Sequence, residues 1–116
     1  MANESCLFCR ILAGEVPGDV VYQDERSVVI RDVNPQAPMH VLVIPREHLE
    51  SLDDAAQKDE PLLGHLLRVG ARVASEQGYD ESGYRSVINT GPGAGQSVFH
   101  LHVHVLAGRP LNWPPG

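Results

Sequence analysis

Three histidines at alternate positions near the end of the chain form its most chemically informative group. They are His100, His102 and His104, separated by Leu101 and Val103. In a β-strand, alternate side chains point to the same face and lie about 7 Å apart. The spacing therefore predicts three imidazoles on one face of a strand, close enough to converge on one phosphate group or one metal ion.

The pattern of the histidines alone leaves three interpretations open. In the first interpretation, they form the solvent-facing side of a half-buried strand. In the second, they bind a catalytic metal that keeps an open coordination position. In the third interpretation, a neutral imidazole attacks phosphorus and leaves a covalent nucleotidyl-histidine that water later cleaves. The preceding residues 91–97 are rich in glycine, which lets backbone N–H groups approach an anion closely. This loop favours phosphate chemistry, because a metal site does not need it.

Two cysteines near the start of the chain form a second candidate site. Cys6 and Cys9 are one helical turn apart, so both thiols lie on one face of a predicted short helix. Two thiolates supply half of a tetrahedral metal site. A redox pair is one alternative, although no predicted strand precedes Cys6 as in a thioredoxin-type motif. A plain reduced pair is the other.

The spacing of apolar residues predicts the elements that position these side chains. Apolar residues at helical spacing predict a long amphipathic helix over 61–78 and a short helix over 5–13. Consecutive strands with few helices favour an α+β class built on an antiparallel sheet, in a single domain over 1–116. Runs of β-branched residues between turn signals predict five strands, at 19–23, 27–31, 40–44, 84–89 and 98–106.

The composition argues against several kinds of partner. The 116 residues carry a formal net charge of −6, so the chain lacks the basic footprint that nucleic acid or an anionic membrane requires. No apolar run approaches the roughly 20 residues of a membrane span, and residues 1–14 lack the basic start and apolar core of a signal peptide. We therefore expect no nucleic-acid partner, no membrane partner and a cytoplasmic location.

The segment around the histidines resembles one known family, the histidine triad nucleotide-binding proteins. The resemblance is carried by Gln-Ser-Val-Phe-His-Leu-His-Val-His-Val-Leu at 96–106, by Gly-Arg-Pro at 108–110 and by Trp-Pro-Pro-Gly at 113–116. It extends over nearly the whole chain, because other segments match that family in the same order, at 32–40, 43–45, 63–65 and 83–85.

For the fold, the resemblance implies a five-stranded antiparallel sheet with one long and one short helix. Two such sheets pair into a continuous ten-stranded sheet in a homodimer. The C-terminal tail, residues 107–116, reaches towards the partner subunit. Gly70 in the long helix is consistent with a close approach of helices in that dimer.

For the activity, the resemblance implies a hydrolase of purine nucleoside 5′-phosphoramidates that works through a covalent nucleotidyl-histidine. His102 would be the nucleophile, His104 would contact the phosphate and carry protons, and His40 would approach from the adjoining strand. Ser97 would protonate the leaving amine, which departs readily only when protonated. The alternatives are a dinucleoside polyphosphate hydrolase and a nucleotide-binding regulatory protein with incidental turnover. The Trp-Pro-Pro-Gly ending and Ser97 favour the first activity.

The same resemblance implies how a purine nucleotide binds. Asp32 would accept hydrogen bonds from both ribose hydroxyls. Asn89 and Gln96 would hold phosphate oxygens, with Gly95 permitting a close approach. Trp113 resembles the tail tryptophan that reaches the partner subunit's site. The base would lie in an apolar slot formed by Phe8, Ile11, Val16, Ile30 and Val33.

For the cysteines, the resemblance supplies two further metal ligands. Many bacterial relatives use a histidine shortly after the Ile-Pro strand end and the first histidine of the triad, which here are His48 and His100. The implied cofactor is a structural zinc, held by Cys6, Cys9, His48 and His100, that the chemistry does not require. A zinc bound to His100 would prevent that imidazole from attacking phosphorus.

Overall fold

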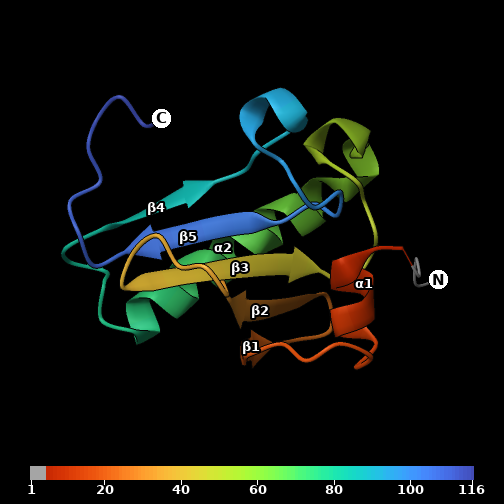
Figure 1. Cartoon of the computed structure of the whole chain (residues 1–116), viewed down its shortest axis with the longest axis horizontal. Coiled ribbons are helices and arrows are strands. Elements are labelled where there is room, and N and C mark those ends of the chain that lie inside the picture. Colours follow the sequence, from red (N-terminus) through yellow and green to blue (C-terminus); the bar gives the residue numbers. More distant parts are fainter. Residues whose placement is uncertain (1–4) are drawn as a thin grey trace.

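Residues 5–116, which the computed structural model describes, form a five-stranded antiparallel sheet with helices on its two faces (Figure 1). The helices are α1 (Leu7–Leu12) and α2 (Glu60–Glu76), with short 3-10 helices η1 (Leu52–Asp54), η2 (Gln57–Asp59) and η3 (Pro92–Ala94). The strands are β1 (Val20–Gln23), β2 (Ser27–Arg31), β3 (Met39–Pro45), β4 (Tyr84–Val87) and β5 (Val103–Ala107). The predicted α+β class and sheet are confirmed.

The strand order of the sheet is β1-β2-β3-β5-β4, with β3 at its centre. After the β1-β2-β3 meander the chain passes through α2, forms the edge strand β4 and returns as β5 between β3 and β4. In the β3–β5 pair, His40 lies opposite Leu106 and Leu42 lies opposite His104. Because opposite residues share a face of an antiparallel pair, His40 and His104 lie on the same face.

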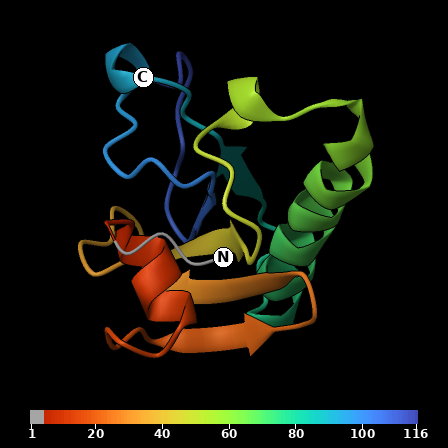
Figure 2. The same cartoon turned by 90° about the vertical axis from the view of Figure 1, so that its right-hand side faces the viewer.

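The other face of the sheet carries the larger core, which α2 covers (Figure 2). Val41 and Val43 of β3 and Val105 of β5 point into it. Gly70 allows α2 to lie close to the sheet, since a Cβ there would meet Cγ2 of Val105 at 2.9 Å. Gly70 therefore packs inside its own chain, and it does not support the dimer as the sequence had indicated.

A smaller core beneath α1 covers the face that carries the histidines. Phe8 of α1 packs with Leu42 and Ile44 of β3, which alternate with the valines of the larger core. The sulfur of Cys6 accepts the N–H of Cys9 at 3.3 Å, so the first cysteine caps the helix. This cap fixes both thiols at the start of α1, beside the histidine face.

The last predicted strand, 98–106, is wrong over its first half, because β5 begins at Val103. In the β3–β5 register the position opposite Leu101 is Pro45, which has no N–H to donate and ends β3. The N–H of Leu101 donates instead to the carbonyl of Leu49, at 2.7 Å. His100 and His102 therefore precede the strand, and only His104 lies within it.

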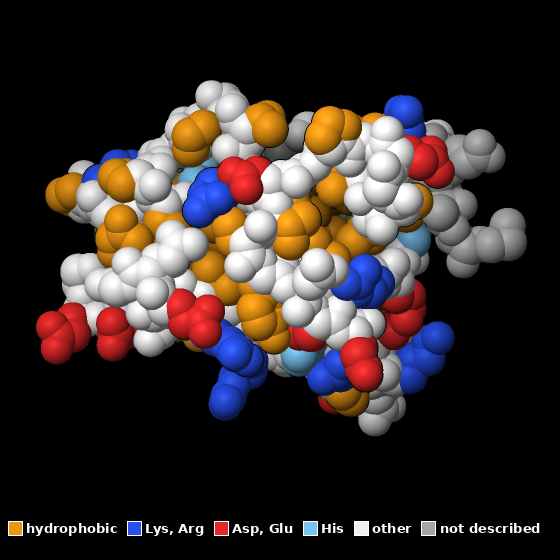
Figure 3. All heavy atoms as spheres, turned by 90° about the horizontal axis from the view of Figure 1, so that it is seen from below, with side chains coloured by type: hydrophobic (Ala, Val, Ile, Leu, Met, Phe, Trp, Pro, Cys, Tyr) orange, Lys and Arg blue, Asp and Glu red, His pale blue; other side chains and the backbone are white. Residues whose placement is uncertain are grey.

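Charged side chains of both signs lie on the surface. On the face in Figure 3, acidic and basic side chains are interspersed around apolar ones, and the described residues form no extended basic patch there. No helix within residues 5–116 is long and apolar enough to cross a membrane.

Candidate active site and metal centre

A cavity of about 300 Å³ opens beside His102 and His104, on the face of the sheet that α1 covers. Leu7, Arg31, Leu42 and Val98 line it, and the sequence had not singled them out. Most of the predicted site residues also line it: Phe8, Ile11, Ile30, Asp32, Val33, Asn89, Gly95, Ser97, His102 and His104.

Three predicted nucleotide-binding residues do not line this cavity. Val16 is half-buried outside it, and Trp113 is 81% exposed on the tail. Gln96 is only 4% exposed, and its side chain accepts the N–H of Gly91 at 2.8 Å and donates to the carbonyl of Glu50 at 2.7 Å. Its own N–H donates to the carbonyl of Gly91. Gln96 therefore holds the glycine-rich loop in place, instead of contacting phosphate as predicted.

Ser97 presents its polar groups at the edge of the cavity. The N–H of Gly95 donates to the carbonyl of Pro92 inside the loop, where Gly95 has a φ of 93°. In the described part of the chain, the hydroxyl and N–H of Ser97 make no hydrogen bond. The N–H of Gly95 is used inside the loop, whereas the hydroxyl and N–H of Ser97 are available to donate to a ligand.

The hydrogen bond that His102 makes fixes its tautomer. Its Nδ1 lies 2.7 Å from the backbone carbonyl oxygen of His100. A carbonyl oxygen only accepts, so Nδ1 carries the proton and the lone pair is on Nε2. Burial lowers the pKa of His102, which is 8% exposed, so the ring is neutral at neutral pH. His102 therefore has a nucleophilic nitrogen at the cavity.

A second hydrogen-bonded chain orients His104. The N–H of Gln36 donates to Nδ1 of His40 at 3.0 Å, so the proton of neutral His40 is on Nε2. Nε2 of His40 lies 2.9 Å from Nδ1 of His104 and donates to it, which leaves the His104 proton on its own Nε2. Burial lowers the pKa of His40. Burial, with His102 and His40 nearby, lowers the pKa of His104 to about 4.

Asp32, His40 and His104 also bring their donor atoms within 4.8 Å of one another, as metal ligands would. The tautomer of His40 argues against a metal there, since the N–H of Gln36 occupies the lone pair on Nδ1 and Nε2 carries a proton. Oδ2 of Asp32 lies 3.4 Å from that Nε2. This group is therefore a hydrogen-bonded chain from Gln36 through His40 to His104, with the Asp32 carboxylate close to its middle ring.

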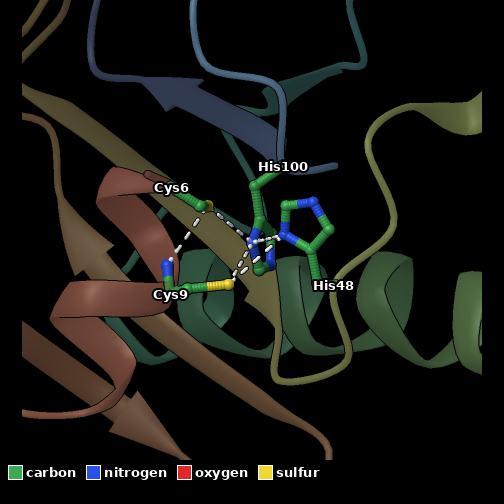
Figure 4. Close-up of side chains that lie close together, drawn as sticks. All are labelled: Cys6, Cys9, His48 and His100. Atoms are coloured by element: carbon green, nitrogen blue, oxygen red, sulfur yellow. Dashed lines mark hydrogen bonds between the residues drawn. The ribbon is translucent and has the colours of Figure 1, made fainter. Parts of the chain in front are cut away.

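The four predicted metal ligands converge from three segments of the chain (Figure 4). Cys6 caps α1 and Cys9 lies within it, His48 follows β3, and His100 precedes β5. Nδ1 of His100 lies 3.3 Å from Sγ of Cys6, 3.5 Å from Sγ of Cys9 and 3.1 Å from Nδ1 of His48. Sγ of Cys9 lies 3.3 Å from Nδ1 of His48.

These distances fit a tetrahedral site. Zinc bonds of about 2.3 Å to sulfur and 2.05 Å to nitrogen place the ligand atoms of a tetrahedron roughly 3.6 Å (S to N) and 3.3 Å (N to N) apart. Nε2 of His100 lies 2.8 Å from the carbonyl oxygen of Pro45 and donates to it, so the lone pair on Nδ1 faces the cluster. Unlike the group around His40, this cluster presents lone pairs to a common centre.

Comparison with known proteins agrees with this geometry. The family model of the HIT domain matches residues 13–111. This chain belongs to the HIT domain family. A HIT family hydrolase from Legionella pneumophila superposes with a TM-score of 0.94 at 44% identity, covering 96% of this chain and 99% of that one.

Two further relatives bear on the metal cluster. The 14 kDa zinc-binding protein of Zea mays is 49% identical over 112 residues, which cover 95% of this chain and 87% of that protein. A Zn-bound histidine triad family protein from Mycobacterium smegmatis has a TM-score of 0.79 and 37% identity, with 91% of this chain and 76% of that one covered.

Within this HIT domain, one of the lining residues missed from the sequence follows from strand alternation. Leu42 is two residues after His40 in β3 and shares its face, so the position of His40 already predicts the side of the sheet on which Leu42 lies. Val98 follows Ser97 in the loop. Nothing in its residue type marks it, because its place depends on the path of the loop after Gly95.

Proposed function

We propose that this HIT domain hydrolyses purine nucleoside 5′-phosphoramidates through a nucleotide covalently bound to Nε2 of His102. One observation carries the proposal: the carbonyl of His100 holds the proton on Nδ1 of His102, so the lone pair of a neutral ring is available at the cavity. A neutral imidazole that is oriented and stripped of water is a competent nucleophile towards phosphorus.

The cavity supports a mononucleotide as the ligand. Phe8, Ile11 and Ile30 provide apolar walls for a purine, and Asp32 provides a carboxylate for the ribose hydroxyls. Oδ1 of Asp32 already accepts the N–H of Asn34 at 2.8 Å, which orients the carboxylate. With the sugar at Asp32, the 5′-phosphate lies towards His102, the residue that attacks it.

In the first step, the lone pair on Nε2 of His102 forms a bond to phosphorus while the P–N bond of the substrate breaks. The electron pair of that bond goes to the departing nitrogen, which takes the proton of the Ser97 hydroxyl and leaves as a neutral amine. The Nε2–H of His104 donates to a phosphate oxygen and stabilises the charge that develops there. The carbonyl of His100 stabilises the positive charge on the His102 ring.

In the second step, water attacks phosphorus and the P–Nε2 bond breaks. The electron pair returns to Nε2 of His102. The water releases one proton to solvent, and this proton replaces the one that solvent returned to Ser97 after the amine left. The products are the nucleoside monophosphate and the free enzyme, so the net reaction consumes one water for each P–N bond.

We further propose that Cys6, Cys9, His48 and His100 hold a structural zinc. The donor set, its spacing and the two zinc-linked relatives support this ion. A zinc there ties α1 to the segments that follow β3 and precede β5. It also engages His100, which leaves attack on phosphorus to His102.

We also propose a homodimer with a continuous ten-stranded sheet. β4 is an edge strand, so one side of its backbone has no partner strand within the described chain. The guanidinium of Arg85 in β4 donates to the carbonyls of Leu111, at 2.7 Å, and Asn112, at 3.1 Å. The tail therefore lies beside the edge where a second copy would pair, which supports a role for Trp113 at the partner's site.

Rapidly quenched mass spectrometry tests the chemistry. Wild-type protein and the His102→Gly variant are mixed with adenosine 5′-phosphoramidate, and their intact masses are compared during turnover. We expect a transient adenylate on the wild type alone, mapped to His102. Product release without an adduct, or undiminished activity in the variant, would contradict the mechanism.

A competition assay separates this activity from that of a dinucleoside polyphosphate hydrolase. We expect kcat/KM for the phosphoramidate to exceed that for diadenosine tetraphosphate at least tenfold. The reverse order would assign the chain to the polyphosphate activity with the same nucleophile. Tight binding of nucleotide with turnover of neither substrate would favour a regulatory protein.

A further inference from the structure

A second hollow, of about 430 Å³, adjoins the nucleotide cavity at Ser97. The two hollows share Leu7, Ser97 and Val98 as lining residues. Beyond this boundary the second hollow is lined by residues that the nucleotide cavity lacks: Ser5, Cys6, His48, Glu50 and Phe99. We call it the Glu50–Phe99 hollow.

The chemistry at Ser97 indicates which part of the substrate lies towards this hollow. In a phosphoryl transfer the attacking and leaving groups lie roughly in line, so the amine departs on the side of phosphorus away from His102. Ser97, which protonates that amine, lies at the boundary of the two hollows. The substituent on the nitrogen therefore extends beyond Ser97, away from the nucleotide cavity.

Glu50 gives the hollow a negative charge on a backbone that is held in place. Its backbone carbonyl accepts from the side chain of Gln96 at 2.7 Å, and the carbonyl of the preceding Leu49 accepts the N–H of Leu101 at 2.7 Å. Within residues 5–116 the Glu50 carboxylate makes no ion pair or hydrogen bond, and no Lys or Arg lines the hollow. The loop that carries Ser97 thus holds the backbone of Glu50, and the exposed carboxylate of Glu50 lines the hollow beside Ser97.

Phe99 adds an aromatic wall to the same hollow. Phe99 is 47% exposed, although it lies two residues after Ser97 in a loop that Gln96 and Leu101 hold by hydrogen bonds. A partly exposed phenyl ring near a carboxylate suits an aliphatic stem that ends in a cation, because the ring packs on the stem and its face attracts the charge.

We propose that the Glu50–Phe99 hollow is the leaving-group subsite, and that it selects amines with a second positive charge at the end of an aliphatic stem. The proposal rests on the phosphoramidate hydrolysis proposed above and names its preferred substrate class. Glu50 attracts the distal cation, and Phe99 contacts the stem. A leaving group with a distal carboxylate is disfavoured at the same site.

Three adenosine 5′-phosphoramidates of equal stem length test this selectivity. Their amines are 1,5-diaminopentane, pentylamine and 5-aminopentanoate, with a cationic, a neutral and an anionic end. For the wild type we expect kcat/KM to fall about threefold at each step in that order, the size typical of one partly exposed ion pair. Added salt is expected to reduce both steps.

Two variants of Glu50 test the residue itself. In Glu50→Gln the three values of kcat/KM are expected to converge within about twofold of one another, and in Glu50→Lys the order is expected to reverse. Glu47→Gln is the matched control, because Glu47 is exposed three residues earlier and lines neither hollow. It is expected to keep both the rates and the order of the wild type.

The outcomes distinguish the leaving-group subsite from the phosphoramidate hydrolysis on which it rests. No preference in the wild type, or an unchanged preference in both Glu50 variants, overturns the subsite while hydrolysis of the amidates stands. Failure to hydrolyse any of the three, with no adduct on His102, overturns the proposed function instead.

Discussion

The backbone carbonyl oxygen of His100 lies 2.7 Å from Nδ1 of His102, and it joins the metal cluster to the candidate nucleophile. The side chain of His100 faces Cys6, Cys9 and His48, while its backbone fixes the tautomer of His102. One residue thus serves both sites with different atoms. Whatever holds the side chain of His100 also holds the carbonyl that orients the nucleophile.

Removal of the proposed zinc is still expected to destabilise the fold more than it disables the chemistry, because Nε2 of His100 keeps its hydrogen bond to the carbonyl of Pro45. Native mass spectrometry is expected to find one zinc per chain in the wild type and none in Cys9→Ser. Chelation is expected to lower Tm by ten degrees or more, because the ion joins three segments of a small domain. The protein that stays folded is still expected to form the His102 adduct. Complete loss of the adduct from folded protein would instead indicate a catalytic metal.

Ser97→Ala is expected to slow the release of strongly basic amines. Without the hydroxyl, an alkylamine leaves phosphorus unprotonated, so kcat/KM for its amidate is expected to fall about 100-fold or more. An aniline is a far weaker base and leaves more readily without a proton, so the loss for its amidate is expected to be under about tenfold. Steady-state kinetics on the two amidates measure the difference.

The control for that series is Ser75→Ala, an exposed serine on α2. It is expected to change neither rate. Equal losses for both amidates in Ser97→Ala would show that Ser97 acts by placing the substrate and not by transferring a proton.

Acidification is expected to lower the free energy of unfolding between pH 6.5 and about 4, and His104 contributes to this loss. In the unfolded chain a histidine binds a proton below about pH 6.5, whereas burial holds the pKa of folded His104 at about 4. Between these values the unfolded state binds more protons, so stability is present above the window and is lost as the pH falls through it. One such group contributes a slope of up to about 1.4 kcal/mol per pH unit.

Urea denaturation at several pH values measures this slope. His104→Asn is expected to flatten it by about one proton relative to the wild type. The comparison of the two proteins cancels the protons that the cysteine and histidine metal ligands take up in both. Identical slopes would mean that His104 titrates normally in the fold.

Sequence patterns predicted what depends on neighbours along the chain, and missed what depends on distant partners. The periodicity of apolar residues predicted α2, and the alternation of residues predicted that His102 and His104 lie on the same face. The start of β5 could not be predicted from neighbouring residues. It depends on Pro45, which ends the partner strand β3 and lies more than fifty residues earlier in the chain. The resemblance implied that Gln96 is a phosphate ligand, and no local pattern indicates that its side chain binds the carbonyl of Glu50 in a different segment.

The metal cluster shows the same limit. The spacing of Cys6 and Cys9 predicts two ligands on one helical face, and it contains no information about His48, which lies in a loop after β3. Only resemblance to relatives supplied that residue. The tautomers that distinguish this cluster from the group around His40 depend on the carbonyl of Pro45 and on the N–H of Gln36, which sequence patterns do not place.

A lysine at the free edge of the sheet is expected to separate the proposed homodimer. Ser86 is exposed in the edge strand β4, so Ser86→Lys places like charges at the edge where two copies would pair. Light scattering is expected to give twice the 12.6 kDa chain mass for the wild type and the single-chain mass for the variant.

Gln23→Lys is the matched control, because Gln23 is exposed in β1 at the opposite edge of the sheet. If Gln23→Lys dissociates the protein and Ser86→Lys does not, the two copies pair through β1. The ten-stranded sheet would then be joined at the edge far from Trp113, which would remove the tail from the partner's site.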